Sequence, residues 1–305
     1  MSIPLAFLNG SWVPADQAMV TVSDAGFVLG VGIADQLRTF GGKLFRADEH
    51  IQRLGKGLQV LGLNVPYSPK VLAEKAHELA AMNYRLLPAG GDLGLGIVVT
   101  PGTVGTISGT DDGQPWVCMH TYPLPFHRWA KKYELGQSLV TTPIPMIPAD
   151  CWPSDIKCRS RLHYYLADRL AQQREPGSRA LLLNSQGFVR EISTANILLI
   201  RRHGPRWQLV SPPLHTILPG ITLSAVREWV CTWPDWEFIE EDFPPDSLLT
   251  ASEVWLTSTP WCVLPVTRFN GHPLPIGPHY SRLLQTWLAQ TGIDISTQAS
   301  SLHGA

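Results

Sequence analysis

Residues 181–200 read LLLNSQGFVREISTANILLI, and this stretch decides the fold more than any other. The apolar run Ala180–Leu183 ends at a turn signal, Ser-Gln-Gly at 185–187. A second run, Phe188–Glu191, is followed by a polar cluster and then by a third run, ILLI at 197–200. Short apolar runs separated by turn residues are typical of β-strands. The stretch therefore predicts three successive strands joined by tight turns.

Glu191 closes the second of these strands, and Ser193, Thr194 and Asn196 follow it. A carboxylate at a strand end is often a solvated surface group. It can also hold a pyridinium nitrogen protonated, which makes a cofactor ring an electron sink. These residues alone leave both interpretations open.

Upstream, Lys157 follows Pro-Ser-Asp-Ile and precedes a helical pattern that we expect to run from Arg159 to Gln173. The lysine thus lies at a junction between elements. An imine-forming lysine must be held at a fixed point and kept partly neutral, which favours such a place. A solvated lysine at a helix start is the alternative.

Downstream, Leu218-Pro-Gly-Ile-Thr222 forms a tight turn that leads directly into a helix expected at Thr222–Thr232. Backbone N–H groups without partners and the helix dipole face an anion at such a start, so a phosphate could bind there. The alternative is a Pro-Gly turn that begins a locally capped helix.

The 305 residues amount to about twice the usual domain size. We expect a smaller α/β domain at 1–124, a connection at 125–135 and a larger α/β domain at 136–305. The connection is predicted from the prolines and clustered aromatic residues of TYPLPFHRWAKKYE (121–134). After residue 191, strand, turn and strand are expected to continue to Val210. The elements expected elsewhere are strands at 5–8, 12–13, 33–40, 93–100, 254–259 and 263–269, and helices at 48–63, 69–86 and 280–291.

Composition excludes several classes of partner. The 24 Lys and Arg residues balance 25 Asp and Glu residues, so no global field attracts nucleic acid or anionic lipid. The longest apolar stretches are far below the roughly 20 residues of a membrane span. Five cysteines without a Cys-x-x-Cys pair indicate free thiols in a reducing cytosol, and the N-terminus, MSIPLAFLNGSW, lacks a basic leader. We expect a cytoplasmic protein with no membrane segment, no nucleic-acid partner and no metal site.

Five separated blocks resemble, in the same order, the signature blocks of the class IV aminotransferases. They are residues 7–54, which end in His-Ile-Gln-Arg-Leu, then KCRSRLHYYLADRLA (157–171), residues 181–200, SPPLHTILPGIT (211–222) and VWLTSTPWCVLPV (254–266). The resemblance covers roughly residues 6–275 and is closest in pattern to branched-chain aminotransferases, D-amino-acid transaminase and aminodeoxychorismate lyase. It implies the fold-type IV architecture of D-amino-acid aminotransferase, with two α/β domains, a homodimer, and pyridoxal 5′-phosphate bound in a cleft between the domains.

The resemblance also implies roles for named residues. Lys157 corresponds to the Schiff-base lysine that moves the proton, and Glu191 to the partner of the pyridine nitrogen. The other residues expected around the cofactor are Arg53, Leu218, Ile221, Thr222 and Thr259. The residues expected at the substrate are Leu29, Arg38, Arg161 and Pro260.

The chain departs from the family pattern at several of these places. Branched-chain enzymes carry a tyrosine four or five residues after the lysine, where this chain has Arg161 and Leu162. Their opening block has a tyrosine and a Phe-Glu pair where this chain has Leu29 and Ala34-Asp35. The Arg-x-His carboxylate trap of D-amino-acid transaminases is absent around Thr100–Gly105, which weakens a D-specific interpretation.

We therefore expect an aminotransferase that moves an amino group from an aliphatic, branched-chain L-amino acid to 2-oxoglutarate. Alternatives on the same fold are an aminodeoxychorismate lyase and a D-amino-acid or amine transaminase. A lyase would release pyruvate without aminating an added keto acid. A binding homologue that has lost catalysis is the alternative from another class, motivated by the missing tyrosines, and it would not bind the cofactor.

Overall fold

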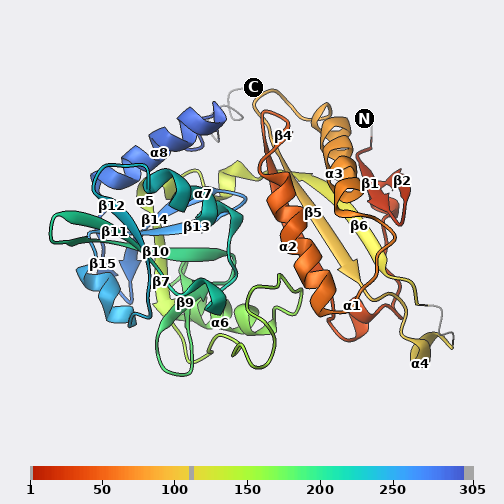
Figure 1. The fold of residues 1–305 in the computed structure, drawn as a ribbon, viewed down its shortest axis with the longest axis horizontal. Helices are drawn as coiled ribbons and strands as arrows, with labels where there is room; N and C mark the ends of the chain where they lie inside the picture. Colours follow the sequence, from red (N-terminus) through yellow and green to blue (C-terminus); the bar gives the residue numbers. More distant parts are fainter. Residues whose placement is uncertain (1–2, 110–112, 299–305) are drawn as a thin grey trace. The chain divides into compact units, whose positions relative to one another are not determined.

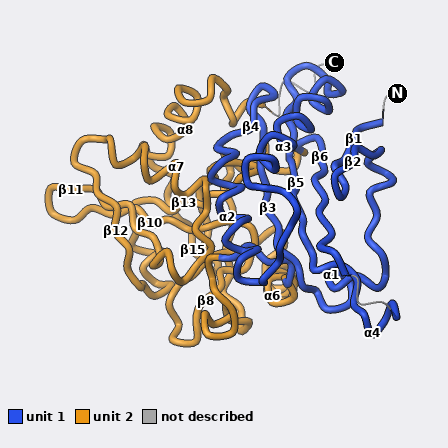
Figure 2. The backbone as a smooth tube through the Cα atoms, turned by 45° about the vertical axis from the view of Figure 1, so that its right-hand side comes forward, with its two compact units in different colours: residues 1–124, 156–160 blue, residues 125–155, 161–305 orange. Residues whose placement is uncertain are grey.

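The computed structural model describes residues 3–109 and 113–298. The chain divides into two compact units, one of residues 1–124 with Ile156–Ser160, the other of Pro125–Asp155 with the residues from Arg161 onward (Figure 2). Each unit combines helices with a β-sheet, which confirms the expected fold class. Segment 125–135, expected to be a connection, lies in the second unit. The outermost residues of the two expected domains, 1–2 and 299–305, lie outside the described residues.

The first unit contains a six-stranded antiparallel sheet in the order β2-β1-β6-β5-β3-β4, with helices α2 and α3 packed on it (Figure 1). Asn9 and Gly10 both have positive φ and close the β1–β2 hairpin, as an Asn-Gly pair predicts. Ser68 caps α3 by accepting a hydrogen bond from the Val71 N–H, and Pro69 occupies the first helical position. The elements are β1 (Leu5–Leu8), β2 (Ser11–Pro14), α1 (Ala25–Val28), β3 (Ile33–Phe40), β4 (Lys43–Leu44), α2 (Ala47–Val60), α3 (Pro69–Tyr84), β5 (Leu93–Thr100), α4 (Gly105–Ser108) and β6 (Trp116–Pro123).

The second unit is built on a nine-stranded sheet in which β10-β13-β14-β7-β8-β9 pair in sequence. Because β9 also pairs with β10, these strands close into a barrel, which β11 and β12 extend beyond β10. The strands are β7 (Gln137–Thr141), β8 (Arg179–Leu183), β9 (Val189–Ile192), β10 (Ala195–His203), β11 (Arg206–Ser211), β12 (Trp236–Glu240), β13 (Glu253–Ser258), β14 (Cys262–Phe269) and β15 (His272–Pro273). The helices are α5 (Lys132–Leu135), α6 (Leu162–Arg174), α7 (Ile221–Val230) and α8 (Pro278–Thr291).

Side chains of the barrel strands alternate between two cores. Leu139 and Leu181 belong to the cluster that fills the barrel, together with residues of β9, β10, β13 and β14. Their neighbours Val140, Ala180 and Leu182 belong instead to the cluster beneath α6. This period of two is the side-chain geometry of a strand, and it separates an inner from an outer face at each barrel strand.

Five strands of the structure are absent from the elements expected from sequence, namely β4, β6, β7, β12 and β15. The helix expected from Arg159 begins instead at Leu162, because Cys158 forms a bridge with Ile33 and the Arg159 N–H donates to the Gly32 carbonyl. None of the helices in the described part of the chain is both long and apolar enough to cross a membrane. All five cysteines have free thiols.

Candidate active site

Lys157 is fixed by backbone pairing and not by a helix. The Ala34 N–H donates to the Lys157 carbonyl at 2.8 Å, and the Arg159 N–H donates to the Gly32 carbonyl at 2.8 Å. Cys158 thus forms an isolated antiparallel bridge with Ile33 at the start of β3. The half-buried lysine therefore projects from an extended segment anchored to the sheet of the first unit, a rigid position for a reactive amine.

A buried ionic cluster lies in the same unit. Nε of Arg53 donates to Oδ2 of Asp35 at 3.0 Å, and Nη2 donates to Oδ1 at 2.9 Å. His50 contacts the same carboxylate through Nδ1 at 2.6 Å. Burial alone would raise the pKa of Asp35, but the Arg53 charge and the hydrogen bonds from His50 and Arg53 outweigh it, and the pKa is lowered.

Burial lowers the pKa of His50 despite the nearby Asp35 carboxylate, and the positive charges of Arg53 and Lys157 lower it further. The ring is therefore neutral at neutral pH. The effect of Lys157 on His50 also locates the lysine's charge near this cluster. The sequence-predicted residues Lys157 and Arg53 thus share one charged neighbourhood, in which Arg53 is already bound to Asp35.

The other two expected residues of the first unit differ in their surroundings. Arg38 is only 1% exposed, faces Asp92 at 3.7 Å and stacks on the Phe40 ring at 4.0 Å. This burial makes Arg38 a core ion-pair residue, so we leave it out of the substrate site proposed below. Leu29 is 62% exposed, and the next carbonyl, that of Gly30, accepts a hydrogen bond from Ser160 Oγ at 2.6 Å. Leu29 therefore lies in a loop tied to the segment that carries Lys157.

In the second unit, Glu191 is buried in a network of three hydrogen bonds. Tyr164 Oη donates to its Oε1 at 2.5 Å. Asn196 Nδ2 and the Leu218 N–H donate to its Oε2 at 3.1 and 3.2 Å. Asn196 Nδ2 also donates to the Leu218 carbonyl at 2.7 Å. The carboxylate therefore has a fixed orientation, as a partner for a ring nitrogen requires.

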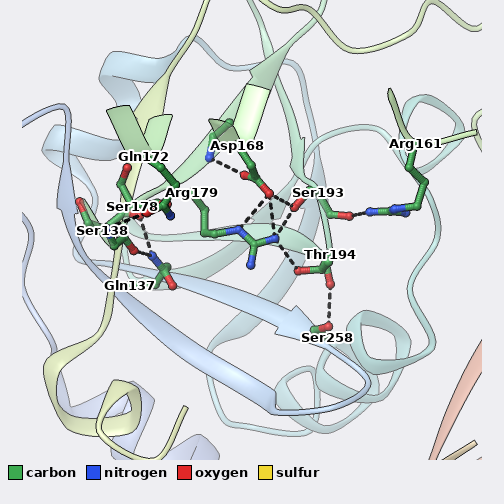
Figure 3. A network of polar contacts seen from close by, with 12 residues as sticks. Gln137, Ser138, Arg161, Asp168, Gln172, Ser178, Arg179, Ser193, Thr194 and Ser258 are labelled. Atoms are coloured by element: carbon green, nitrogen blue, oxygen red, sulfur yellow. Dashed lines mark hydrogen bonds and ion pairs between the residues drawn. The ribbon is translucent and has the colours of Figure 1, made fainter. Parts of the chain in front are cut away.

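Arg161, which replaces the family's tyrosine, is directed into this network and not to solvent. Its Nη2 donates to the Ser193 carbonyl (Figure 3). Its guanidinium lies 4.6 Å from the centre of the Tyr164 ring, a cation–π contact. The ring centre of the adjacent His163 lies 3.9 Å from that of Tyr164, with the two planes tilted by 39°. Burial together with the Arg161 charge lowers the pKa of His163 to about 4.

The start of α7 is the candidate phosphate site of this unit. Gly220 occupies the N-cap position and supplies no side-chain cap, while Ile221 and Thr222 are buried in the first turn. A Cβ atom at Gly220 would overlap Oδ1 of Asn196, so the absence of a side chain permits this close packing. Backbone N–H groups at an uncapped helix start, with a threonine hydroxyl beside them, are donors that fit a phosphate.

Thr259 and Pro260 lie in the turn between β13 and β14. Asn196 pairs with Thr257, so this turn follows the end of β13 that lies beside the start of β10. Ser258 Oγ donates to the Thr194 carbonyl at 2.6 Å and fixes the turn to the residues that follow Glu191. The structure thus brings Glu191, Leu218 and the β13–β14 turn to one region of the second unit.

Sequence reasoning missed Tyr164, His50 and Asp35 as partners of the expected residues. Only Asn196 had a local signal, since it belongs to the polar cluster after Glu191. Tyr164 had none, because its hydroxyl meets Glu191 only through the packing of α6 on the barrel. Within the described residues, no group of three or more His, Cys, Asp or Glu side chains is arranged to hold a metal ion.

Comparisons with known proteins identify the family of the chain. Residues 32–269 match the family model described as amino-transferase class IV. Among curated proteins, a D-alanine aminotransferase of Bacillus licheniformis is 29% identical over 88% of this chain and 89% of its own length. A putative branched-chain-amino-acid aminotransferase of Methanocaldococcus jannaschii is 28% identical over 87% and 88%.

Among solved structures, the chain resembles a branched-chain aminotransferase of Thermoproteus uzoniensis crystallised with norvaline. The TM-score is 0.82 and the identity 24%, over 95% of both chains. It also resembles the Escherichia coli branched-chain amino acid aminotransferase, with a TM-score of 0.84 and 20% identity over 94% of both chains. At these identities, the structural likeness supports the fold alone.

Proposed function

The chain belongs to the class IV aminotransferases, which use pyridoxal 5′-phosphate, and we propose that it transfers the amino group of an aliphatic, branched-chain L-amino acid to 2-oxoglutarate. The observation that carries the proposal is the buried Glu191 carboxylate, held by three donors beside an uncapped helix start. A solvated surface carboxylate needs no such support. A branched-chain relative and the missing Arg-x-His pair around Thr100–Gly105 favour the L-amino acid.

We assign the cofactor-binding roles as follows. Lys157 would bind the cofactor covalently, and its amine would move a proton at the substrate Cα. Glu191 hydrogen-bonds the pyridine nitrogen. The phosphate is held by the first N–H groups of α7 at Ile221 and Thr222, with Thr259 and Arg53.

The bound cofactor supplies an electron sink, and the protein supplies position and charge. Tyr164, Asn196 and the Leu218 N–H hold the Glu191 carboxylate in place. Arg53 offers the phosphate a planar guanidinium whose orientation is set by Asp35. The Lys157 amine lies near the buried cluster of Asp35, His50 and Arg53.

We place Leu29, Arg161 and Pro260 at the substrate. Leu29 replaces an aromatic residue of the family with a smaller aliphatic one, which leaves room for a branched side chain. Pro260 has no backbone N–H to offer a substrate carboxylate, so neighbouring donors must bind that group. Arg161 acts through Tyr164 and Ser193, because its guanidinium contacts both.

We also propose a homodimer and a cytoplasmic location. Residues 19–29 expose several large apolar side chains, including Met19, Val22 and Phe27 at 70%, 77% and 67%. An exposed apolar stretch of this kind favours burial against a second subunit. The five free thiols favour a reducing compartment.

A second candidate is transamination of D-alanine, which the 29% identical relative favours. One experiment separates the candidates. Purified protein is given pyridoxal phosphate, the visible spectrum is recorded before and after borohydride, and the reduced peptide is mapped. L-leucine, L-valine and D-alanine are then supplied singly with 2-oxoglutarate, and the chirality of the glutamate formed is measured.

We expect a visible band, a reduced adduct on Lys157 and formation of L-glutamate from L-leucine or L-valine. Lys157→Ala should lose the band and turnover, whereas Lys70→Ala, at a lysine 86% exposed, should keep both. D-glutamate from D-alanine would replace the proposed substrate by the second candidate. An adduct on another lysine would refute the role of Lys157.

A further inference from the structure

The turn between β9 and β10 follows the strand that carries Glu191 and consists of two residues, Ser193 and Thr194. The register sets this length, because Ile192 pairs with Ala195 across the turn. Two-residue hairpin turns usually have a positive φ at a central residue, typically glycine or asparagine, because such turns match the twist of the paired strands. Neither Ser193 nor Thr194 has a positive φ. The backbone of this turn is therefore not of the favoured kind, and other contacts must hold it.

The side chains of this turn are held by an ion pair. Ser193 Oγ donates to Oδ2 of Asp168 at 2.6 Å, and Nη2 of Arg179 donates to Ser193 Oγ (Figure 3). Arg179 itself pairs with Asp168, with 3.1 Å between Nη2 and Oδ2. The same Nη2 donates to Thr194 Oγ1 at 3.2 Å. Both side chains of the turn are therefore bound to one carboxylate–guanidinium pair.

The carbonyl groups of the turn are held as well. Nη2 of Arg161 donates to the Ser193 carbonyl, and Ser258 Oγ donates to the Thr194 carbonyl at 2.6 Å. Hydrogen bonds with a charged partner are about twice as strong as those between neutral groups. Side-chain contacts from α6, β8 and β13 thus fix a turn whose backbone lacks the conformation that a glycine would supply.

Helix α6 holds this hairpin at two points. Tyr164 Oη donates to Oε1 of Glu191 at 2.5 Å, and Asp168 accepts from Ser193 at 2.6 Å. Tyr164 and Asp168 are four residues apart, so they lie on one face of the helix, about 6 Å apart along its axis. Glu191 and Ser193 are two residues apart, and two residues of extended chain span about 6.6 Å. Because the two spacings match, the helix can hold the carboxylate and the turn together.

Asp168 has a single orientation because both of its oxygens are used. Oδ1 accepts from the Ala180 N–H at 3.0 Å, whereas Oδ2 accepts from Ser193 and from Nε of Arg179 at 3.2 Å. The Arg179 and Asp168 side chains are 28% and 23% exposed. Screening by water limits what such a pair adds to the free energy of unfolding. The pair therefore matters more for the position of the turn than for the stability of the fold.

We propose that Asp168 and Arg179 are positioning residues for Glu191. They fix the turn through Ser193, and the turn holds Glu191 opposite Asn196, whose Nδ2 donates to Oε2 of Glu191 at 3.1 Å. The Glu191 carboxylate is thereby oriented before the cofactor binds, which removes the cost of orienting it on binding. The inference rests on the proposed function, in which Glu191 hydrogen-bonds the ring nitrogen of pyridoxal phosphate.

The test compares pyridoxal phosphate with 1-deazapyridoxal 5′-phosphate, in which a C–H group replaces the ring nitrogen. Both dissociation constants are measured by fluorescence titration of the full-length protein after its cofactor has been removed. The ratio of the constant for the deaza compound to that for pyridoxal phosphate measures what the ring nitrogen contributes. Because a hydrogen bond to a charged group is among the stronger ones, we expect this ratio to be about ten or more in the unmodified protein.

Two variants release the turn in different ways. Ser193→Ala removes the hydroxyl that the ion pair holds. Asp168→Asn offers one acceptor oxygen where the carboxylate uses two. We expect each variant to lower the ratio about three- to tenfold, while the deaza compound binds within about twofold of its affinity for the unmodified protein. The matched control Ser185→Ala, at an exposed serine in the preceding turn between β8 and β9, should leave the ratio unchanged.

The outcomes separate this inference from the proposed function. An unchanged ratio in both Ser193→Ala and Asp168→Asn would overturn the inference, even if the two compounds bound more weakly, because equal weakening is what a purely structural role produces. A ratio near one in the unmodified protein would also overturn it, since the ring nitrogen would then contribute nothing although pyridoxal phosphate binds. Failure of the unmodified protein to bind pyridoxal phosphate at all would refute the proposed function itself.

Discussion

Replacing Asp35 by asparagine removes one charge from the buried cluster of the first unit and keeps the side-chain shape. The carboxylate is 1% exposed and accepts two hydrogen bonds from Arg53 and one from His50. The amide can accept at only one oxygen and carries no charge to balance the guanidinium. Removing one partner of a buried ion pair costs about 3–5 kcal/mol, so we expect Asp35→Asn to lower the free energy of unfolding by that amount at pH 7.

The pH dependence has a definite sign. Because the pKa of Asp35 is lowered in the folded state, the ionised carboxyl stabilises the fold at every pH above its unfolded value of about 3.8. This contribution is lost as the pH falls further, through the lowered pKa. The difference between the unmodified protein and Asp35→Asn should therefore stay constant from pH 8 to 5 and shrink only in stronger acid.

The assay is denaturant unfolding followed by circular dichroism, at a series of pH values. Asp48→Asn is the control, since Asp48 is exposed in the first turn of the same helix as Arg53. There, only the interaction with the helix dipole is lost, about 0.3–1 kcal/mol. A loss below about 1 kcal/mol in Asp35→Asn, or a difference that already shrinks between pH 8 and 6, would contradict the assignment of a charged buried pair.

Three other substitutions test the second unit. Tyr164→Phe removes one donor from Glu191 and should lower the free energy of unfolding by about 1–2 kcal/mol. It should also raise the pyridoxal phosphate concentration needed for half-saturation. Tyr165→Phe, at an exposed tyrosine, is the control and should change neither quantity. Gly220→Ala places a methyl group against the amide that binds Glu191, so cofactor titration should show weaker binding while the far-ultraviolet spectrum stays unchanged. The lowered pKa of His163 opposes its protonation in the folded state, so the unmodified protein should lose stability as the pH falls from about 6.5 to about 4. His163→Gln should abolish this loss. Equal losses of stability in both proteins between about pH 7.5 and 5 would rule this out.

Elements with signals inside their own sequence could be predicted closely. The Asn9-Gly10 hairpin, the helix that begins at Pro69 and the strand pair around Pro260 are of this kind, because turn and cap residues specify backbone conformation locally. Strand β7 lacked such a signal. It follows a segment of aromatic and basic residues, and its partners are β14 and β8, which come much later in the chain. Closure of the barrel depends on these long-range pairings, which no local pattern specifies.

The candidate site likewise contains some features that could be predicted from sequence and others that could not. The turn at Leu218–Thr222 and the carboxylate at the end of a strand could be found from sequence, since each has a local backbone signature. The pairing of Arg53 with Asp35 could not be found, because the two residues lie on different elements and become neighbours only when α2 packs on β3.

The position of Lys157 shows why a helical pattern misled the boundary prediction. Apolar spacing after Lys157 predicted a helix from Arg159, yet Arg159 donates its N–H to Gly32 and Ala34 donates to the lysine carbonyl. A backbone hydrogen bond to a distant strand has no side-chain pattern, so it can override a helical propensity worth only tenths of a kcal/mol per residue. The same pairing holds Lys157 on an extended segment, where its backbone is bonded to the sheet and its amine remains near His50. The element boundary that sequence could not locate is therefore the feature that positions the proposed catalytic amine.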